Sequence, residues 1–132
     1  STAAPSTISQ AAAVEAFRGS QESVSMMRAA FEARRDYMVE RINAIPHVSC
    51  LKPEGAFYVM MNLDEVLGHT IHGRKIENSA DFAAAFVEEE MVATVPGSAF
   101  GADHYIRWSY ATDMDTIRKG MDRLENFMKD MK

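Results

Sequence analysis

The spacing of hydrophobic residues changes along the chain, from a helical period to alternation and back. Apolar residues recur every three or four positions at 23–45, which predicts one long helix, and Pro46 ends that pattern. The same spacing predicts helices at about 8–17, at 80–90 and from 112 to near the C-terminus. We therefore expect four helices, the second of which is the longest.

Polar residues at the expected helix starts indicate which side chains cap them. Ser79 precedes the helix at 80–90, and Thr112 starts the last helix with Asp115 three residues later, a shortened capping box. The segment from Gly68 to Asn78 is polar and contains two glycines, so we expect a loop there.

Apolar and alternating runs predict strands in the second half of the chain. GAFYVMMNL at 55–63 predicts a strand buried on both faces, 91–95 predicts a short strand that Pro96 stops, and 105–111 predicts a third. Roughly eight residues join the last two strands, too few for a crossover helix, so these strands are expected to pair antiparallel. The predicted fold class is α+β, a small, mostly antiparallel sheet of about three strands packed against helices.

The composition fits one globular domain without a polyanion-binding surface. Of the 132 residues, 47% are hydrophobic and 25% are charged. The formal net charge of -5 argues against nucleic acid as a partner. The single cysteine, Cys50, cannot form an internal disulfide, and no apolar run approaches the roughly 20 residues needed to cross a bilayer. A cytoplasmic location and no membrane contact are expected.

Three residues with ligating or nucleophilic side chains lack a setting for chemistry. His69 and His72 are three residues apart in a glycine-flanked loop without an obvious third ligand, so no metal site is expected. Cys50 has no closely placed cluster of basic residues, so we expect an inert thiol. The glycines of VPGSAFG indicate a tight turn, since a phosphate cradle needs a helix N-terminus after it and a strand is expected there.

Arg107 is the residue whose position needs a chemical explanation. In YIRWSY, at 105–110, alternation places Arg107 on the face opposite Trp108. A cation on a central or near-central strand is partly desolvated and needs an anion. The residues alone favour an internal salt bridge over a ligand carboxylate held by two parallel hydrogen bonds, and both remain open. The acids considered as internal partners are Asp64, Glu88 and Asp103.

Several segments together resemble one enzyme family. GAFYVMMNL, FVEEEMVATVPGSAFG and YIRWSYATDMDTIRKGMDRL, in this order and spacing, resemble the C-terminal part of the class I and II pyridoxal-phosphate (PLP) aminotransferases, the aspartate aminotransferase family of fold type I. STAAPSTISQAAAVEAF is similar to the family segment that follows the cofactor lysine by a few dozen residues. The resemblance covers essentially the whole chain.

The resemblance implies roles for four residues near the expected strands. Arg107 lies in an Arg-x-Ser-Tyr-Ala strand, whose arginine binds the substrate α-carboxylate in the family. Phe57 and Tyr58, at the entry of the first strand, and the turn at 95–101 would shape the mouth of the site. Ser109 shares the face of Arg107 and is expected to help fix its rotamer, which is an inference from alternation.

The catalytic part of such an enzyme is expected to lie upstream of Ser1. In the family, a lysine forms the Schiff base with PLP, and other upstream elements hold the phosphate and the ring. The lysines of this chain occupy no such motif: Lys52, Lys75, Lys119, Lys129 and Lys132. We therefore expect no catalytic residue and no PLP binding within the chain taken alone.

The resemblance also implies a division of the chain and a function for the intact enzyme. Residues 1–132 would form one C-terminal fragment, in which 1–19 packs on a missing large domain, 23–45 links the domains and 46–132 is the small domain. The intact homodimer would use PLP to move an amino group between an α-amino acid, aspartate as the first choice, and a 2-oxo acid. A stand-alone carboxylate-binding module or a protein-interaction module is the alternative.

Overall fold

A computed structural model of the chain describes residues 21–132. The helix expected at 8–17 and the segment 1–19 lie outside the described residues. The described part contains three α-helices, one short 3₁₀ helix and two small sheets. The α-helices are α2 (Gln21–Asn43), α3 (Ser79–Glu90) and α4 (Met114–Met128).

The main sheet has four antiparallel strands in the order β1-β2-β6-β5, and a separate two-stranded sheet joins β3 to β4. The strands are β1 (Ser49–Cys50), β2 (Tyr58–Asn62), β3 (Thr70–Ile71), β4 (Arg74–Lys75), β5 (Val95–Pro96) and β6 (Tyr105–Ser109). The predicted α+β class, with a small antiparallel sheet and helices, is confirmed. β6 lies between β2 and β5, as a central strand.

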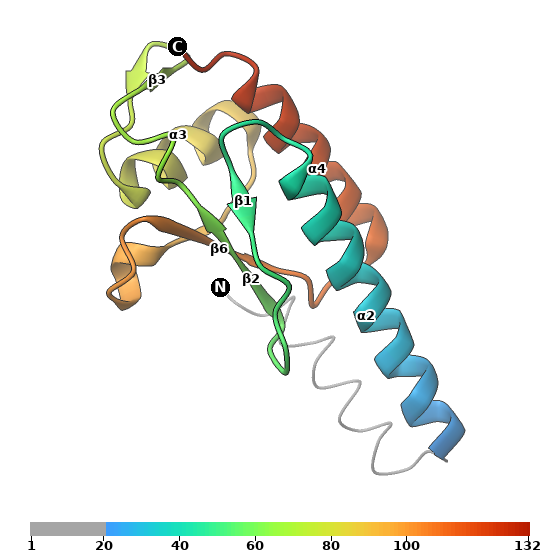
Figure 1. Cartoon of the computed structure of the whole chain (residues 1–132). Coiled ribbons are helices and arrows are strands. Elements are labelled where there is room, and N and C mark those ends of the chain that lie inside the picture. Colours follow the sequence, from blue (N-terminus) through green and yellow to red (C-terminus); the bar gives the residue numbers. More distant parts are fainter. Residues whose placement is uncertain (1–20) are drawn as a thin grey trace.

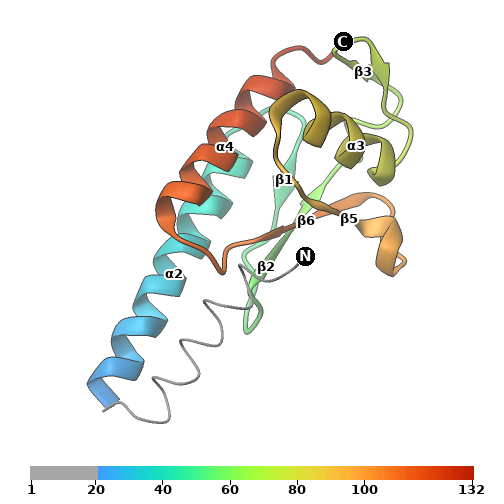
Figure 2. The same cartoon turned by 180° about the vertical axis from the view of Figure 1, so that it is seen from behind.

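The helices lie together on one side of the main sheet. α2 and α4 run side by side, and α3 packs near the other end of α4 (Figure 1). In the view from behind, α3 lies on the near side of the strands and α4 lies in front of α2 (Figure 2). Alternation follows from this arrangement, because Ile106 and Trp108 of β6 are buried whereas Tyr105, Arg107 and Ser109 are only partly buried. Among residues 21–132, no α-helix covers the opposite face of the sheet.

An aromatic cluster fills the space between the sheet and the helices. Phe86 of α3 lies with its ring centroid 5.1 Å from that of Phe127 of α4 and 5.7 Å from that of Trp108 of β6. Phe82 contacts Phe127 edge-on at 5.4 Å. Offset and edge-to-face contacts of this kind stabilise a core beyond the area they bury. This cluster holds α3, α4 and β6 together.

Three expectations about strands are corrected. β2 is buried on one face only, since Val59 and Met61 are buried and Tyr58 is exposed. The strand expected at 91–95 is reduced to Val95–Pro96, because the αL residue Met91 ends α3 and donates its N–H to the Val87 carbonyl. Proline is tolerated in β5 because this strand lies at the edge of the sheet. The loop expected between 68 and 78 contains the β3–β4 hairpin, and β1 was not predicted.

Both predicted helix caps are wrong by one residue. The Asn78 side chain, and not that of Ser79, accepts a hydrogen bond from the Asp81 N–H at 2.9 Å. Asp113, and not Thr112, accepts from the Thr116 N–H at 2.7 Å, and this bond lowers the pKa of the Asp113 carboxyl. Ser79 is fully buried and its hydroxyl bonds elsewhere, so it is not available as a cap.

None of the helices in residues 21–132 has the length and the apolar composition that a membrane-spanning helix requires.

The aromatic cluster predicts a large difference between two neighbouring positions of α3. Phe86→Ala removes a fully buried ring and should lower the free energy of unfolding by about 3–5 kcal/mol. Val87→Ala is the matched control, since Val87 is 39% exposed and its truncation should change stability by no more than about 0.5 kcal/mol. Chemical denaturation followed by circular dichroism measures both values. Equal losses in the two variants would contradict the packing described.

Candidate functional site

Arg107 lies in the centre of the open face of the sheet. Its backbone is opposite Met60 of β2 on one side and opposite Val95 of β5 on the other. Because β6 alternates, the side chain points away from the helices, on the face opposite Trp108. Arg107 is partly buried there, so its guanidinium keeps access to solvent.

Two aromatic rings support the guanidinium of Arg107. Its Cζ atom lies 4.3 Å from the ring centroid of Tyr58 and 5.2 Å from that of Phe100. Tyr58 belongs to β2, and Phe100 belongs to the 3₁₀ helix η1 (Gly97–Phe100) that follows β5. The rings therefore come from the two elements that flank β6. Both distances are within the roughly 6 Å at which a cation interacts favourably with an aromatic face.

The internal salt bridge that the sequence favoured is not present within residues 21–132. Each of the three candidate acids has another partner: Asp64 pairs with His104 at 2.6 Å, Glu88 with Arg74 at 2.9 Å, and Asp103 accepts from the Ser79 hydroxyl at 2.8 Å. The expectation assumed that the face of Arg107 was covered. Because no α-helix of residues 21–132 covers that face, Arg107 stays partly exposed beside two aromatic rings, and no internal anion is required.

The other residues expected at the site separate into two groups. Tyr58 contacts Arg107, whereas the ring of Phe57 lies 5.0 Å from Phe31 of α2 and 6.0 Å from Tyr110. Phe57 lies directly before β2, and its ring packs toward α2 while that of Tyr58 lies on the Arg107 side. Ser109 lies on the side of Arg107, but its hydroxyl accepts a hydrogen bond from the Ala111 N–H at 3.2 Å.

Phe100 is the residue of this site that the sequence did not single out. It was included only as a member of the expected turn at 95–101. The turn contains η1, which Gly101 ends with a φ of 81°, a left-handed value that favours glycine. The Ala102 N–H donates to the Gly97 carbonyl at 2.8 Å and closes the turn. An aromatic residue directly before a turn glycine, as in VPGSAFG, is the sequence feature that could have indicated Phe100.

Gly97 is required where the turn begins. A Cβ atom at this position would lie 1.7 Å from the carbonyl oxygen of Ala102 and 2.7 Å from that of Tyr105. Both obstacles are backbone atoms, so a side chain at position 97 displaces the turn itself. The glycine therefore serves a close approach of the backbone to itself.

Buried Ser79 attaches this turn to the start of α3. The Ser98 N–H donates to the Ser79 hydroxyl oxygen at 3.1 Å, and the Ser79 hydroxyl donates to Asp103 at 2.8 Å. The Ser79 N–H donates to the same carboxylate oxygen at 3.3 Å. One serine thus connects both arms of the turn that carries Phe100.

A depression of about 640 Å³ lies on the open face next to Tyr58. Its lining residues come from β1 and the segment after it, from β2, and from the chain that leads into β6: Ser49, Cys50, Leu51, Pro53, Tyr58, Met60, Asn62, Ala102 and Tyr105. Burial raises the pKa of the Cys50 thiol to about 11, which agrees with the inert thiol expected from the sequence. The depression is mostly apolar and shares Tyr58 with the arginine site.

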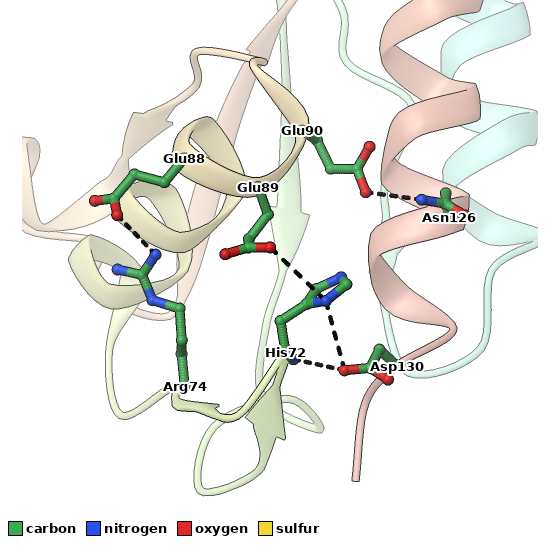
Figure 3. A network of polar contacts seen from close by, with 7 residues as sticks. All are labelled: His72, Arg74, Glu88, Glu89, Glu90, Asn126 and Asp130. Carbon is green, nitrogen blue, oxygen red and sulfur yellow. Dashed lines mark hydrogen bonds and ion pairs between the residues drawn. The ribbon is translucent and has the colours of Figure 1, made fainter.

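A network of polar side chains, separate from the residues around Arg107, joins the β3–β4 hairpin to α3 and α4 (Figure 3). His72 Nδ1 lies 3.8 Å from a Glu89 oxygen and 3.7 Å from an Asp130 oxygen, and its ring stacks on that of Phe127 at 5.5 Å. Arg74 binds Glu88 at 2.9 Å. Within residues 21–132 no group of histidine, cysteine and acidic side chains has the arrangement of a metal site. These contacts connect the hairpin to both helices.

Three of the described lysines lie outside β6, the strand of Arg107. Lys52 pairs with Asp36 of α2 at 3.3 Å, and its side chain is 57% exposed. Lys119 belongs to α4, which covers the face of the sheet opposite Arg107. Lys75 lies in β4 of the separate hairpin.

The chain matches the family described as "Aminotransferase class I and II" over residues 1–124. It is 41% identical over 129 residues to an aspartate aminotransferase of Bacillus sp. (strain YM-2), covering 98% of this chain and 32% of that protein. It is also 41% identical over 126 residues to a probable aspartate/prephenate aminotransferase of Rickettsia felis, covering 95% of this chain and 31% of that protein.

Solved structures show the same similarity. The aspartate aminotransferase from Rhizobium meliloti superposes with a TM-score of 0.83 at 38% identity, covering 94% of this chain and 31% of that chain. The alanine aminotransferase from Pyrococcus furiosus superposes with a TM-score of 0.74 at 28% identity, covering 89% and 28%. The chain therefore spans about a third of the length of the relatives it matches.

The close approach at Gly97 predicts that this position does not accept a side chain. Gly97→Ala should lower the free energy of unfolding by about 1–3 kcal/mol, because the methyl group forces the backbone of the turn apart. Ser98→Ala is the control, since the exposed Ser98 contributes its backbone N–H to the bond with Ser79. Urea denaturation measures both changes. A Gly97→Ala chain as stable as the unaltered one would contradict the turn geometry.

The raised pKa of Cys50 predicts slow alkylation. With a pKa of about 11, the thiolate fraction at pH 8 is small, and iodoacetamide should react on the order of 100-fold more slowly than with a free thiol. The rate should rise about ten-fold per pH unit between pH 8 and 10, which mass spectrometry can follow. The urea-unfolded chain is the control and should react like a free thiol. A rate that levels off near pH 8.5 in the folded chain would contradict the burial described.

Proposed function

Since the chain belongs to the class I and II aminotransferase family, we propose that it is the C-terminal part of a PLP-dependent transaminase in which Arg107 binds the substrate α-carboxylate. The observation that supports this role is the partly buried Arg107 on the open face, which has no acidic partner within residues 21–132. Its N–H donors are therefore available to a ligand.

Arginine suits this role because its planar guanidinium presents two parallel N–H donors to a carboxylate. Charge-assisted hydrogen bonds of this kind stabilise a complex by about 1.5–3 kcal/mol each. Two such bonds fix both the position and the orientation of the ligand. In the longer enzyme, this orientation would direct the remaining bonds of the substrate Cα toward the catalytic groups.

The proposed reaction moves an amino group between an α-amino acid and a 2-oxo acid. Aspartate is our first choice of amino acid, because the relatives above are named as aspartate and probable aspartate/prephenate aminotransferases. Similar solved structures include alanine and aromatic aminotransferases, so neutral and aromatic amino acids are the other substrate classes to test.

PLP supplies an electron sink for such a reaction when the longer enzyme binds it. We assign PLP binding and proton transfer to the part of the enzyme outside this chain, because the lysines of this chain occupy no motif like that of the family's cofactor lysine. This chain contributes the carboxylate contact and the surface around it. We also propose that the longer enzyme is a homodimer, as the resemblance implies, and that it is cytoplasmic, as expected from the composition.

A stand-alone carboxylate-binding module is the second candidate, because an arginine without an acidic partner serves it equally well. The other alternative was a protein-interaction module in which Arg107 forms an internal salt bridge. The structure does not favour it, because Asp64, Glu88 and Asp103 have other partners. The reading frame upstream of Ser1 separates the two functions. A lysine motif upstream supports the transaminase, and a native start codon immediately before Ser1 would exclude it.

The complete reading frame allows a direct kinetic test of Arg107. Arg107→Ala should lower kcat/KM for transfer from aspartate to 2-oxoglutarate on the order of 10²- to 10⁴-fold, since two charge-assisted bonds are lost. Arg107→Lys should be less damaging but still impaired, because an ammonium does not form the parallel pair. A coupled spectrophotometric assay measures these rates. Unchanged kcat/KM in Arg107→Ala would refute the assignment.

A further inference from the structure

We propose that Tyr58 and Phe100 are positioning residues that hold the guanidinium of Arg107 ready for a carboxylate, in place of an acidic partner. The proposal rests on the carboxylate role of Arg107 proposed above and names how the chain prepares it. The two residues form the aromatic pair, which is defined by their contacts with Arg107 at 4.3 Å and 5.2 Å.

The register of the sheet explains why Tyr58 reaches Arg107. Tyr58 is opposite Ser109, and Met60 is opposite Arg107, so Tyr58 and Arg107 form a diagonal pair on one face of two antiparallel strands. Diagonal neighbours lie within reach of aromatic and long side chains. The exposed ring of Tyr58 therefore lies against the guanidinium without any distortion of the strand.

Phe100 approaches from the other side of β6 and is fixed by its turn. Gly97 allows the turn to close, and the Ser79 hydroxyl bonds both to the Ser98 N–H and to the Asp103 carboxylate. These contacts fix the backbone that presents the Phe100 ring, although the ring itself is 42% exposed. The flexible arginine side chain thus lies near one ring on each flank.

An aromatic support differs from an acidic one in what it leaves available. A carboxylate would occupy the N–H donors of the guanidinium, as Asp122 does for Arg41 at 2.7 Å. A ring face attracts the cation through its quadrupole and leaves the N–H edge open. The aromatic pair therefore lowers the conformational freedom of Arg107 without competing with a ligand for its hydrogen bonds.

Leucine substitutions in the 132-residue chain test the aromatic pair. Tyr58→Leu and Phe100→Leu should each weaken 2-oxoglutarate binding about two- to five-fold, the size of an exposed cation–π contact. Tyr58→Phe should bind 2-oxoglutarate with the affinity of the unaltered chain, because it keeps the ring. Phe57→Leu is the matched control, since Phe57 is 40% exposed, close to the 43% of Tyr58, but its ring contacts Phe31 and Tyr110. Calorimetry measures affinity, and circular dichroism verifies that each variant is folded.

A second readout reports on Arg107 itself and does not depend on ligand binding. In the ¹⁵N-labelled chain, the ring currents of the aromatic pair should shift the Arg107 Nε–H signal, and Tyr58→Leu and Phe100→Leu should each move it toward the position of an ordinary arginine. Phe57→Leu should leave it unchanged. A variant that merely loosened the fold would instead move signals throughout the spectrum.

The outcomes separate this proposal from the carboxylate role itself. A signal that stays in place in both leucine variants, or unchanged affinity in both, would overturn the positioning role. Absence of binding by the unaltered chain, or binding that survives Arg107→Ala, would also overturn it. In each of these cases the kinetics of the complete reading frame still decide whether Arg107 binds the substrate carboxylate.

Discussion

The pairing of β2 with β6 in one register determines both the core and the candidate site. This register places Met60 opposite Arg107 and Val59 opposite Trp108. One side of the pair packs under the helices through the Trp108 ring, and the other side presents Arg107 to solvent. A slip of one residue in either strand would exchange its two faces, so that a cation would enter the core or an indole would leave it. Stability and site geometry therefore depend on the same set of backbone hydrogen bonds.

Arg107 is stabilised by its surroundings in a way that keeps it available. The acids that the sequence suggested as partners of Arg107 are bonded to other residues. The rings of Tyr58 and Phe100 lie against its guanidinium instead. A fully covered face would have required an internal anion, because an unpaired buried charge is too costly. An open face allows a cation that is oriented and not neutralised, which is the condition for binding a carboxylate from outside.

The elements predicted from the sequence were those whose signal is local. The periodic stripes of α2 and α4 and the alternation around Trp108 depend on each segment alone, and they agree with the structure. β1 and the β3–β4 hairpin were missed because two-residue strands are defined by distant partners and not by their own pattern. The cap of α3 shifted by one residue because the burial of Ser79, decided by tertiary packing, removed its hydroxyl from the helix start.

Only part of the candidate site could be predicted from the sequence, because the rest depends on contacts between distant segments. Arg107 and Tyr58 could be identified from their strands and the family motif. That Arg107 has no acidic partner within residues 21–132 depends on which face of the sheet the described α-helices cover, and a single strand does not reveal this. Phe57, directly before β2, lies against Phe31 of α2 and not against Arg107. Phe100 depends on the fold of a turn that is fixed by Gly97 and Ser79, and no periodic pattern reveals such a contact.

The most direct test of this account is a crystal structure of the chain with bound 2-oxoglutarate. The account predicts a ligand carboxylate in two parallel hydrogen bonds, about 2.7–2.9 Å long, to the Arg107 guanidinium on the open face of the sheet. It also predicts that the rings of Tyr58 and Phe100 keep their contacts with this side chain. Arg107 paired with Asp64, Glu88 or Asp103, or a ligand bound at another place, would contradict the central claim.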